Sequence, residues 1–181
     1  MKGLWIWAFE EAVNGRYGER VWDSMLETAG MDGVYTPMGN YPPEDLLRLG
    51  EAGAEVVGRP AAELLDWQGT EAVGLIAERY PYFVESHHSP QSLIRAIDSF
   101  IDPGFWRHHN PYVPVFDFEQ AAPDRLSVLY RPRPSAILCA TIGGAIKGMV
   151  LVFGEEPDVR QSSCMWDGAG HCVFEVGLGR R

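Results

Sequence analysis

The stretch Val113-Pro114-Val115-Phe116-Asp117-Phe118 marks a change of pattern along this chain. Apolar and other residues alternate through it, and the same alternation returns over residues 126–130, which predicts two strands. Before this stretch, apolar residues recur at spacings of three and four, which is typical of amphipathic helices. Residues 1–110 are therefore expected to be mainly helical, and residues 111–181 are expected to hold a sheet with a helix.

The helix and strand signals divide the chain further. Ser89 followed by Pro90 is a typical helix start, because serine caps the first N–H groups and proline fits the first helical position. The expected helices span residues 3–14, 18–29, 44–57, 61–77, 89–101 and 136–153, with a further short helix after Pro103. The expected strands span residues 113–118, 126–130, 158–165 and 171–177. This order predicts an α+β fold in which a helical part is followed by an antiparallel sheet with a packed helix.

Composition and charge restrict the class of protein. The chain has 181 residues and is 46% hydrophobic, so it can bury a full core, and we expect a single domain over residues 1–181. Its net charge of -10 repels phosphate backbones and anionic lipids, so neither nucleic acid nor membrane is expected as a partner. No run approaches the ~18 apolar residues of a membrane span. Three cysteines cannot all pair within one chain, which favours a reducing compartment, the cytoplasm.

Two features that could suggest an enzyme or a nucleotide site have simpler interpretations. The glycine-rich run 141–145 lies inside an expected helix and lacks the strand, loop and lysine of a phosphate-binding loop, so we expect close helix packing there. Asp98 and Asp102 are four residues apart, but no histidine or further carboxylate is evident beside them. We therefore expect a protein that is not an enzyme.

Several short motifs follow one another in an order that resembles a known family. They are Met1-Lys2-Gly3, Tyr17-Gly18-Glu19, Asp32-Gly33-Val34-Tyr35-Thr36, Arg79-Tyr80-Pro81, Pro114-Val115-Phe116 and the segment from Cys164 to Glu175. Their order and spacing resemble the heme nitric oxide/oxygen binding (H-NOX, or HNOB) domains of the bacterial stand-alone type. The resemblance implies an H-NOX-like fold and a sensory role.

The family's heme ligand has no counterpart in this sequence. In the resembled proteins a helix ends in Ile-His or Leu-His shortly before the Pro-x-Phe strand, and that histidine ligates the iron. The matching segment here is Ile101-Asp102-Pro103, which places Asp102 at the histidine position and Pro114 at the start of the strand. A carboxylate is a hard oxygen donor and a poor replacement for imidazole on ferrous heme. His108 and His109 are the nearest substitutes, but His109 lies roughly 10 Å farther along a helix.

Two further departures concern the expected heme pocket. The family's Tyr-x-Ser-x-Arg motif, which binds the heme propionates, reads Tyr130-Arg131-Pro132-Arg133-Pro134 here. Pro132 and Pro134 offer no side-chain donor, so only Arg131 or Arg133 could stand in. Trp5 replaces the modest aliphatic residue that the resemblance implies beside the porphyrin, and its indole could fill that space. The residues counted with the pocket are Asp102, Tyr130, Pro132, Pro134, Trp5 and Pro114.

The three cysteines point to a separate site. Some H-NOX proteins hold a structural zinc with three cysteines and one histidine, and the resemblance places Cys139, Cys164 and Cys172 at those cysteine positions. Gln161 stands at the histidine position, so the fourth ligand could be His171, a water or nothing. The alternative is that the three thiols are buried as small apolar groups. The three cysteines therefore have two interpretations, a structural zinc site or buried thiols without a metal. Heme is doubtful.

The sequence favours a non-enzymatic sensory or regulatory domain over other classes. We expect it to lack the His-ligated heme and to act through a partner protein or a different pocket ligand. The resemblance implies a histidine kinase or a cyclic-di-GMP enzyme as the partner. The alternative is a heme sensor of nitric oxide or oxygen with non-standard ligation. The sequence does not indicate the oligomeric state.

Overall fold

A computed structural model describes residues 1–97, 114–131 and 138–179 of the chain. The helices are α1 (Leu4–Tyr17), α2 (Glu19–Ala29), α3 (Pro43–Val57), α4 (Ala61–Arg79), α5 (Tyr82–Glu85), α6 (Pro90–Ile94) and α8 (Cys139–Leu151). The strands are β1 (Val115–Ala122), β2 (Arg125–Arg131), β3 (Asp158–Ser163) and β4 (Cys172–Gly177), and a 3₁₀ turn, η1 (Met165–Asp167), lies between the last two. The structure confirms the predicted α+β class, with helices first and the sheet later.

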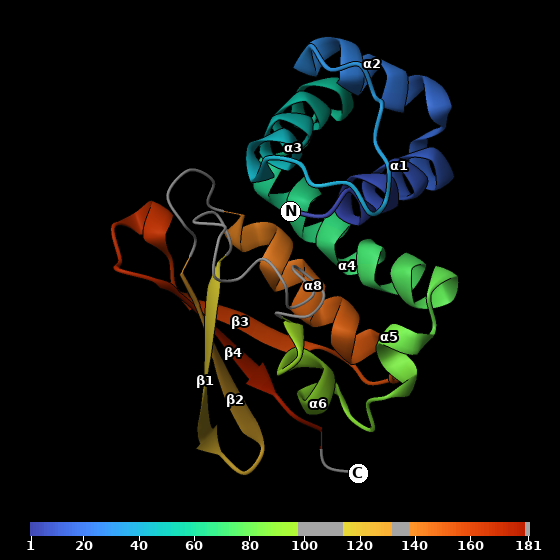
Figure 1. The fold of residues 1–181 in the computed structure, drawn as a ribbon. Helices are drawn as coiled ribbons and strands as arrows, with labels where there is room; N and C mark the ends of the chain where they lie inside the picture. The colour runs from blue at the N-terminus through green and yellow to red at the C-terminus, as the bar shows by residue number, and fades with distance from the viewer. Residues whose placement is uncertain (98–113, 132–137, 180–181) are drawn as a thin grey trace.

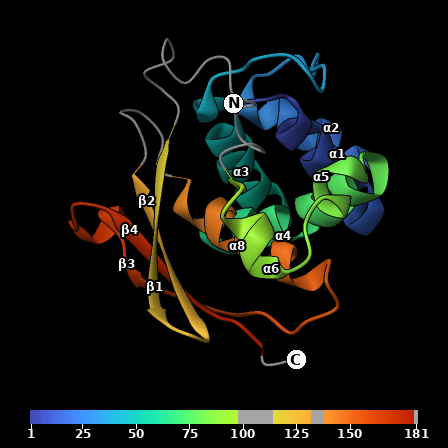
Figure 2. The ribbon, with the colours of Figure 1, turned by 60° about the horizontal axis from the view of Figure 1, so that its bottom comes forward.

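The sheet has four strands in the order β1-β2-β4-β3, and every neighbouring pair is antiparallel. Side chains alternate between its two faces, so Cys172, Phe174 and Val176 of β4 are buried while the residues between them are half-buried. Helix α8 lies against the sheet (Figure 1), and after a turn of the view it stands between the sheet and the helical part (Figure 2). α8 is therefore the central element of the fold.

Two clusters of buried side chains form the core. One joins the sheet, α6, α8 and parts of α1 and α4, and the other joins α1, α2, α3 and α4. Helix α1 contributes to both, because Trp5 and Ala8 belong to the first cluster while Ile6 and Phe9 belong to the second. The helical part and the sheet are thus linked through shared helices.

Helices α4 and α8 approach each other closely along what we call the glycine seam, Gly69 of α4 with Gly144 and Gly148 of α8. A Cβ atom added to Gly69 would lie 2.2 Å from the carbonyl oxygen of Thr141, and one added to Gly144 would lie 1.9 Å from that of Asp66. Backbone thus lies against backbone, which confirms the helix packing that the glycine run 141–145 predicts.

Two details of the helical part differ from the predictions, and a third prediction is not tested. The helix predicted over 89–101 begins as expected, with the Ser89 side chain accepting a hydrogen bond from the Ser92 N–H, but α6 ends at Ile94. The N–H of Ala96 bonds to the Leu93 carbonyl, so the chain tightens into a turn there. The one-turn helix α5 was not predicted. The short helix predicted after Pro103 falls outside the described residues.

Candidate functional site

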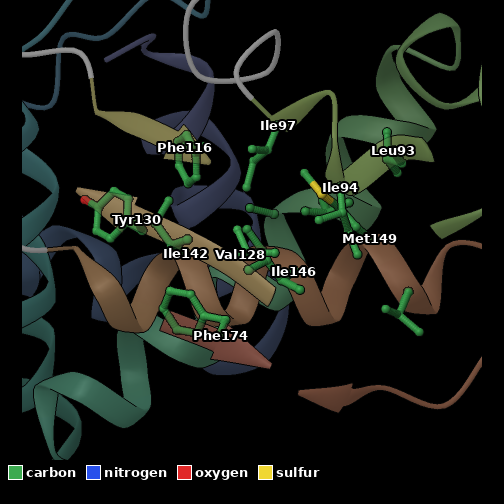
Figure 3. Close-up of a cluster of buried hydrophobic side chains, with 14 of the residues drawn as sticks. Leu93, Ile94, Ile97, Phe116, Val128, Tyr130, Ile142, Ile146, Met149 and Phe174 are labelled. Carbon is green, nitrogen blue, oxygen red and sulfur yellow. The ribbon is translucent and has the colours of Figure 1, made fainter. Parts of the chain in front are cut away.

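Between α8 and the β1–β2 hairpin, buried apolar side chains occupy the region where the sequence predicts the heme pocket. Figure 3 shows Phe116 and Tyr130 of the hairpin beside Ile142 and Ile146 of α8, with Ile97 opposite them. All five residues are buried. The described side chains in this region therefore belong to one continuous apolar cluster.

Trp5 of α1 is part of the same cluster. The residue is 3% exposed, and its backbone carbonyl accepts a hydrogen bond from Nε2 of Gln68, which is fully buried on α4, at 3.4 Å. Two residues later, the half-buried Trp7 packs edge to face on Tyr80 with ring centroids 6.5 Å apart. The position of Trp5 is thus fixed by core packing and by the contact of α1 with α4.

Tyr130 is buried at the end of β2 that meets α8. Its ring lies 5.3 Å from that of Phe116, its partner in the antiparallel register, with 30° between the ring planes. The backbone of Leu138, the residue before α8, hydrogen-bonds to the Tyr130 hydroxyl. Burial raises the pKa of Tyr130, so the phenol stays neutral. The hydroxyl of the expected propionate clamp is therefore engaged by the protein backbone.

The other pocket residues divide into those that the structure describes and those that it does not. Arg131 forms an ion pair with Asp117 of β1 at 2.6 Å, and both side chains are about half exposed. Because neighbouring strand residues face opposite sides of a sheet, Arg131 points away from the side of Tyr130. Pro114 is half-buried directly before β1. Asp102, Pro132 and Pro134, with Arg133, fall outside the described residues.

The three cysteines form a second site at one end of α8. Cys139 is the first residue of that helix, Cys164 follows β3, and Cys172 is the first residue of β4. Their three Sγ atoms all lie within 4.8 Å of one another, and those of Cys139 and Cys164 are 3.7 Å apart. Cys139 and Cys172 are buried, and Cys164 is partly exposed. We call this group the thiol cluster. It could bind a metal ion.

Gln161 and His171 were the two candidate residues for a fourth ligand, and they differ in how they are placed relative to the three sulfurs. The Gln161 side chain hydrogen-bonds to the Cys139 thiol, and its Nε2 also donates to the Ser163 carbonyl at 3.2 Å. The carbonyl of His171 accepts a hydrogen bond from Ser163 Oγ at 3.0 Å. Among the described residues, the metal-ligating atoms that gather here are the three sulfurs, and no imidazole nitrogen of His171 joins them. The thiol cluster thus supplies three sulfur ligands with an amide beside them.

The environment of the thiols favours their neutral form in the metal-free chain. Burial, with a smaller effect from Cys164, raises the pKa of Cys139 from 9.0 to about 12. Burial also raises the pKa of Cys172, although the N–H of Met165, 3.4 Å from its Sγ, acts in the opposite direction. A bound metal would therefore have to displace thiol protons.

Sequence patterns missed two contacts of the pocket region. Phe116 stacks on Tyr130, which alternation in two neighbouring strands could have indicated through cross-strand pairing. The hydrogen bond between Leu138 and Tyr130 has no signal in the sequence, because it depends on where α8 begins relative to β2.

The helical part, the antiparallel sheet and the helix between them define an α+β domain. The family model for haem-NO-binding (HNOB) proteins matches residues 2–161, and this chain therefore belongs to that family. It is an H-NOX domain, a member of a family of heme-binding sensors of nitric oxide and oxygen.

Solved structures agree with this fold. An H-NOX protein of S. oneidensis in the Fe(II)NO ligation state has a TM-score of 0.82 at 23% identity, with 99% of this chain and 100% of that chain covered. The Fe(II) unliganded H-NOX protein of K. algicida has a TM-score of 0.79 at 18% identity, with 100% and 98% covered. A search of curated proteins gave no match. Among the described residues, none of the helices has the length and apolar character needed to cross a membrane.

Proposed function

We propose that this chain is a non-enzymatic regulatory domain of the H-NOX fold that works without a His-ligated heme. The proposal combines a sequence feature with the described pocket. Asp102 stands where the family's pattern has histidine, and an oxygen donor there is a poor ligand for ferrous heme. Pro132 and Pro134 remove two side-chain donors of the propionate clamp.

The strongest support for the proposal comes from the hydroxyl of Tyr130. A clamp must present this hydroxyl to a carboxylate of the ligand, because charge-assisted hydrogen bonds hold propionates. Here the hydroxyl is hydrogen-bonded to the backbone of Leu138, and Tyr130 is 3% exposed. Binding a propionate would require this contact to be exchanged for another.

Trp5 supports the same conclusion from the opposite side of the cluster. Its indole is larger than the aliphatic side chain that the family resemblance implies, and it is buried in the same apolar cluster as Tyr130. Packed interiors have few voids, so the indole occupies volume that a flat macrocycle would need.

A domain of this kind acts by passing its state to another protein. We propose a signalling partner of the histidine kinase or cyclic-di-GMP enzyme type, in the cytoplasm, with residues 1–181 acting as one domain.

Reconstitution with hemin under reducing conditions tests the proposal. The purified wild-type chain is expected to show no sharp Soret band and no spectral change on adding nitric oxide. A sharp Soret band that shifts with nitric oxide would instead identify a gas sensor with non-standard ligation, and the proposal would be wrong.

A matched set of variants shows whether the assay can detect heme in this fold. Asp102→His restores the ligand, and Pro132→Ser with Pro134→Arg restores the clamp. The variant with all four substitutions, in which Trp5→Leu is added to make room, is expected to take up hemin and to give a Soret band that responds to nitric oxide. Each subset of these changes then reports how much of the loss comes from the ligand, the clamp or the indole.

A further inference from the structure

The thiol cluster does not fit the four-ligand zinc site that the family resemblance implies. Zinc in structural sites is almost always tetrahedral with four protein ligands. Cys139, Cys164 and Cys172 supply three sulfurs, and Gln161 offers only a neutral amide, which is a weak ligand for this ion. His171 does not bring a ring nitrogen into the group.

Sulfur spacing in the cluster already suits a single metal ion. At a metal–sulfur distance of about 2.3 Å, sulfurs are about 4.0 Å apart around a trigonal centre and about 3.8 Å apart around a tetrahedral one. The Sγ atoms of Cys139 and Cys164 are 3.7 Å apart, and all three Sγ atoms lie within 4.8 Å of one another. Small side-chain rotations would bring the three to equal distances from one centre.

The groups around the sulfurs direct N–H donors toward them and supply no strong fourth metal ligand. An amide NH₂ has two N–H groups, so Gln161 can donate one to the Ser163 carbonyl and the other to the Cys139 sulfur. The N–H of Met165 points at the Sγ of Cys172. Cys139 is also the first residue of the 13-residue helix α8, whose N-terminus stabilises an anionic sulfur.

We propose that the thiol cluster binds a monovalent, thiophilic cation in three-coordinate geometry, for which Cu(I) is the biological example. Thiolates are soft ligands that select Cu(I), and this ion accepts three sulfurs without a fourth ligand. Three S–H bonds break, three metal–sulfur bonds form, and three protons leave to the solvent. The ion remains Cu(I), so the step requires no oxidant or reductant. The resulting centre carries two negative charges, which the donors from Gln161, Met165 and α8 offset.

Cys164 provides the entry to the site. It is partly exposed, whereas Cys139 and Cys172 are buried, so an incoming ion can bind the outer sulfur first. The site therefore needs no opening of the core to be loaded.

Competition titrations of the full chain test the proposal. Metal-free, fully reduced protein is titrated under anaerobic conditions with Cu(I) against a chromophoric Cu(I) chelator, and separately with zinc against a chromophoric zinc chelator. One equivalent of Cu(I) is expected to be withdrawn from its chelator, with three sulfur neighbours by X-ray absorption at the copper edge. Zinc is expected to be bound at least ~100-fold more weakly than by the variant Gln161→His, since even outer-shell partners change metal affinity by 10- to 100-fold.

Gln161→His is the matched control, because it restores the fourth ligand and leaves the three sulfurs in place. Cys164→Ser removes the most exposed sulfur, and this variant is expected to withdraw less than one equivalent of Cu(I) from the chelator. Far-UV circular dichroism checks that the variant is folded. The proposal is overturned if the wild type holds zinc as tightly as Gln161→His does. It is overturned as well if the wild type withdraws less than one equivalent of Cu(I), or if Cys164→Ser binds Cu(I) unchanged.

Discussion

The two flanks of α8 are built in opposite ways. Toward α4, the helix packs backbone against backbone, because Gly144 lies directly against the backbone of Asp66. Toward the sheet, the same helix presents large side chains such as Ile142 and Ile146, which pack around Tyr130 and Phe116. The glycine seam thus fixes how closely the helical part and the sheet part approach, whereas the sheet flank is filled by side chains that can change shape. A larger side chain should therefore lower the unfolding free energy more at the glycine seam than on the side of α8 that faces the sheet.

The largest effect is expected from Gly69→Ala in the seam. Its new Cβ would lie 2.2 Å from the Thr141 carbonyl oxygen and 2.9 Å from the Ala145 nitrogen. Both are backbone atoms, so the helices must separate, at a cost of about 3 kcal/mol. Urea unfolding followed by circular dichroism measures this loss.

Gly74→Ala, on the same helix, is the matched control. Nothing lies within 4 Å of the added Cβ, and the position is exposed. Replacing a helical glycine by alanine stabilises a helix by about 0.5 to 1 kcal/mol, so this variant should be slightly more stable than the wild type. Equal destabilisation by the two substitutions would show that the seam does not set the helix distance.

The thiol cluster at the end of α8 is expected to give the next largest effect, and the effect depends on pH. The pKa of Cys139 rises from 9.0 to about 12 on folding because the thiol is buried. The folded chain therefore keeps a proton that the unfolded chain loses, so the stabilisation is complete below pH 9 and is lost as the pH rises toward 12. Between pH 9 and pH 10 the unfolding free energy of the metal-free protein should fall by up to about 1.4 kcal/mol for this thiol.

Cys139→Ala separates this effect from other groups that titrate at high pH. The slope of unfolding free energy against pH between 9 and 10 should be smaller in the variant than in the wild type, whatever the absolute stability of the two. Identical slopes would mean that the thiol is not neutral in the folded protein.

On the sheet flank, Tyr130→Phe removes one hydroxyl and keeps the ring that stacks on Phe116. The backbone group of Leu138 then loses its partner inside the protein, which costs about 1 kcal/mol. The same urea titration measures the loss. An unchanged unfolding free energy would indicate a hydroxyl that is free for a ligand, which would weaken the proposal of a heme-independent domain.

The sequence predicted the elements well and the contacts between them less well. Except for α5 and the end of α6, periodicity located the described helices and strands to within a few residues, and the glycines of α8 correctly indicated close packing, because these signals are local. The gathering of Cys139, Cys164 and Cys172 followed only from family resemblance, since their approach depends on how α8 lies on the sheet. The turn after Ile94 was missed, because the apolar pattern continues through it while the N–H of Ala96 bonds three residues back, to Leu93, instead of four.

The smallest effect is expected from the ion pair that crosses the seam. Lys147 of α8 contacts both carboxylate oxygens of Asp66 on α4, at 2.7 and 2.8 Å, and each side chain is about one-third exposed. Solvent and salt screen such a pair, so Lys147→Met should cost about 0.5 kcal/mol at low ionic strength and less in concentrated salt. A double-mutant cycle with Asp66→Asn measures the coupling directly. Because backbone contact at the glycines already sets the helix distance, the pair adds attraction without defining geometry. A loss as large as that of Gly69→Ala, persisting in salt, would reverse this order and make the charges, rather than the glycines, the element that joins α4 to α8.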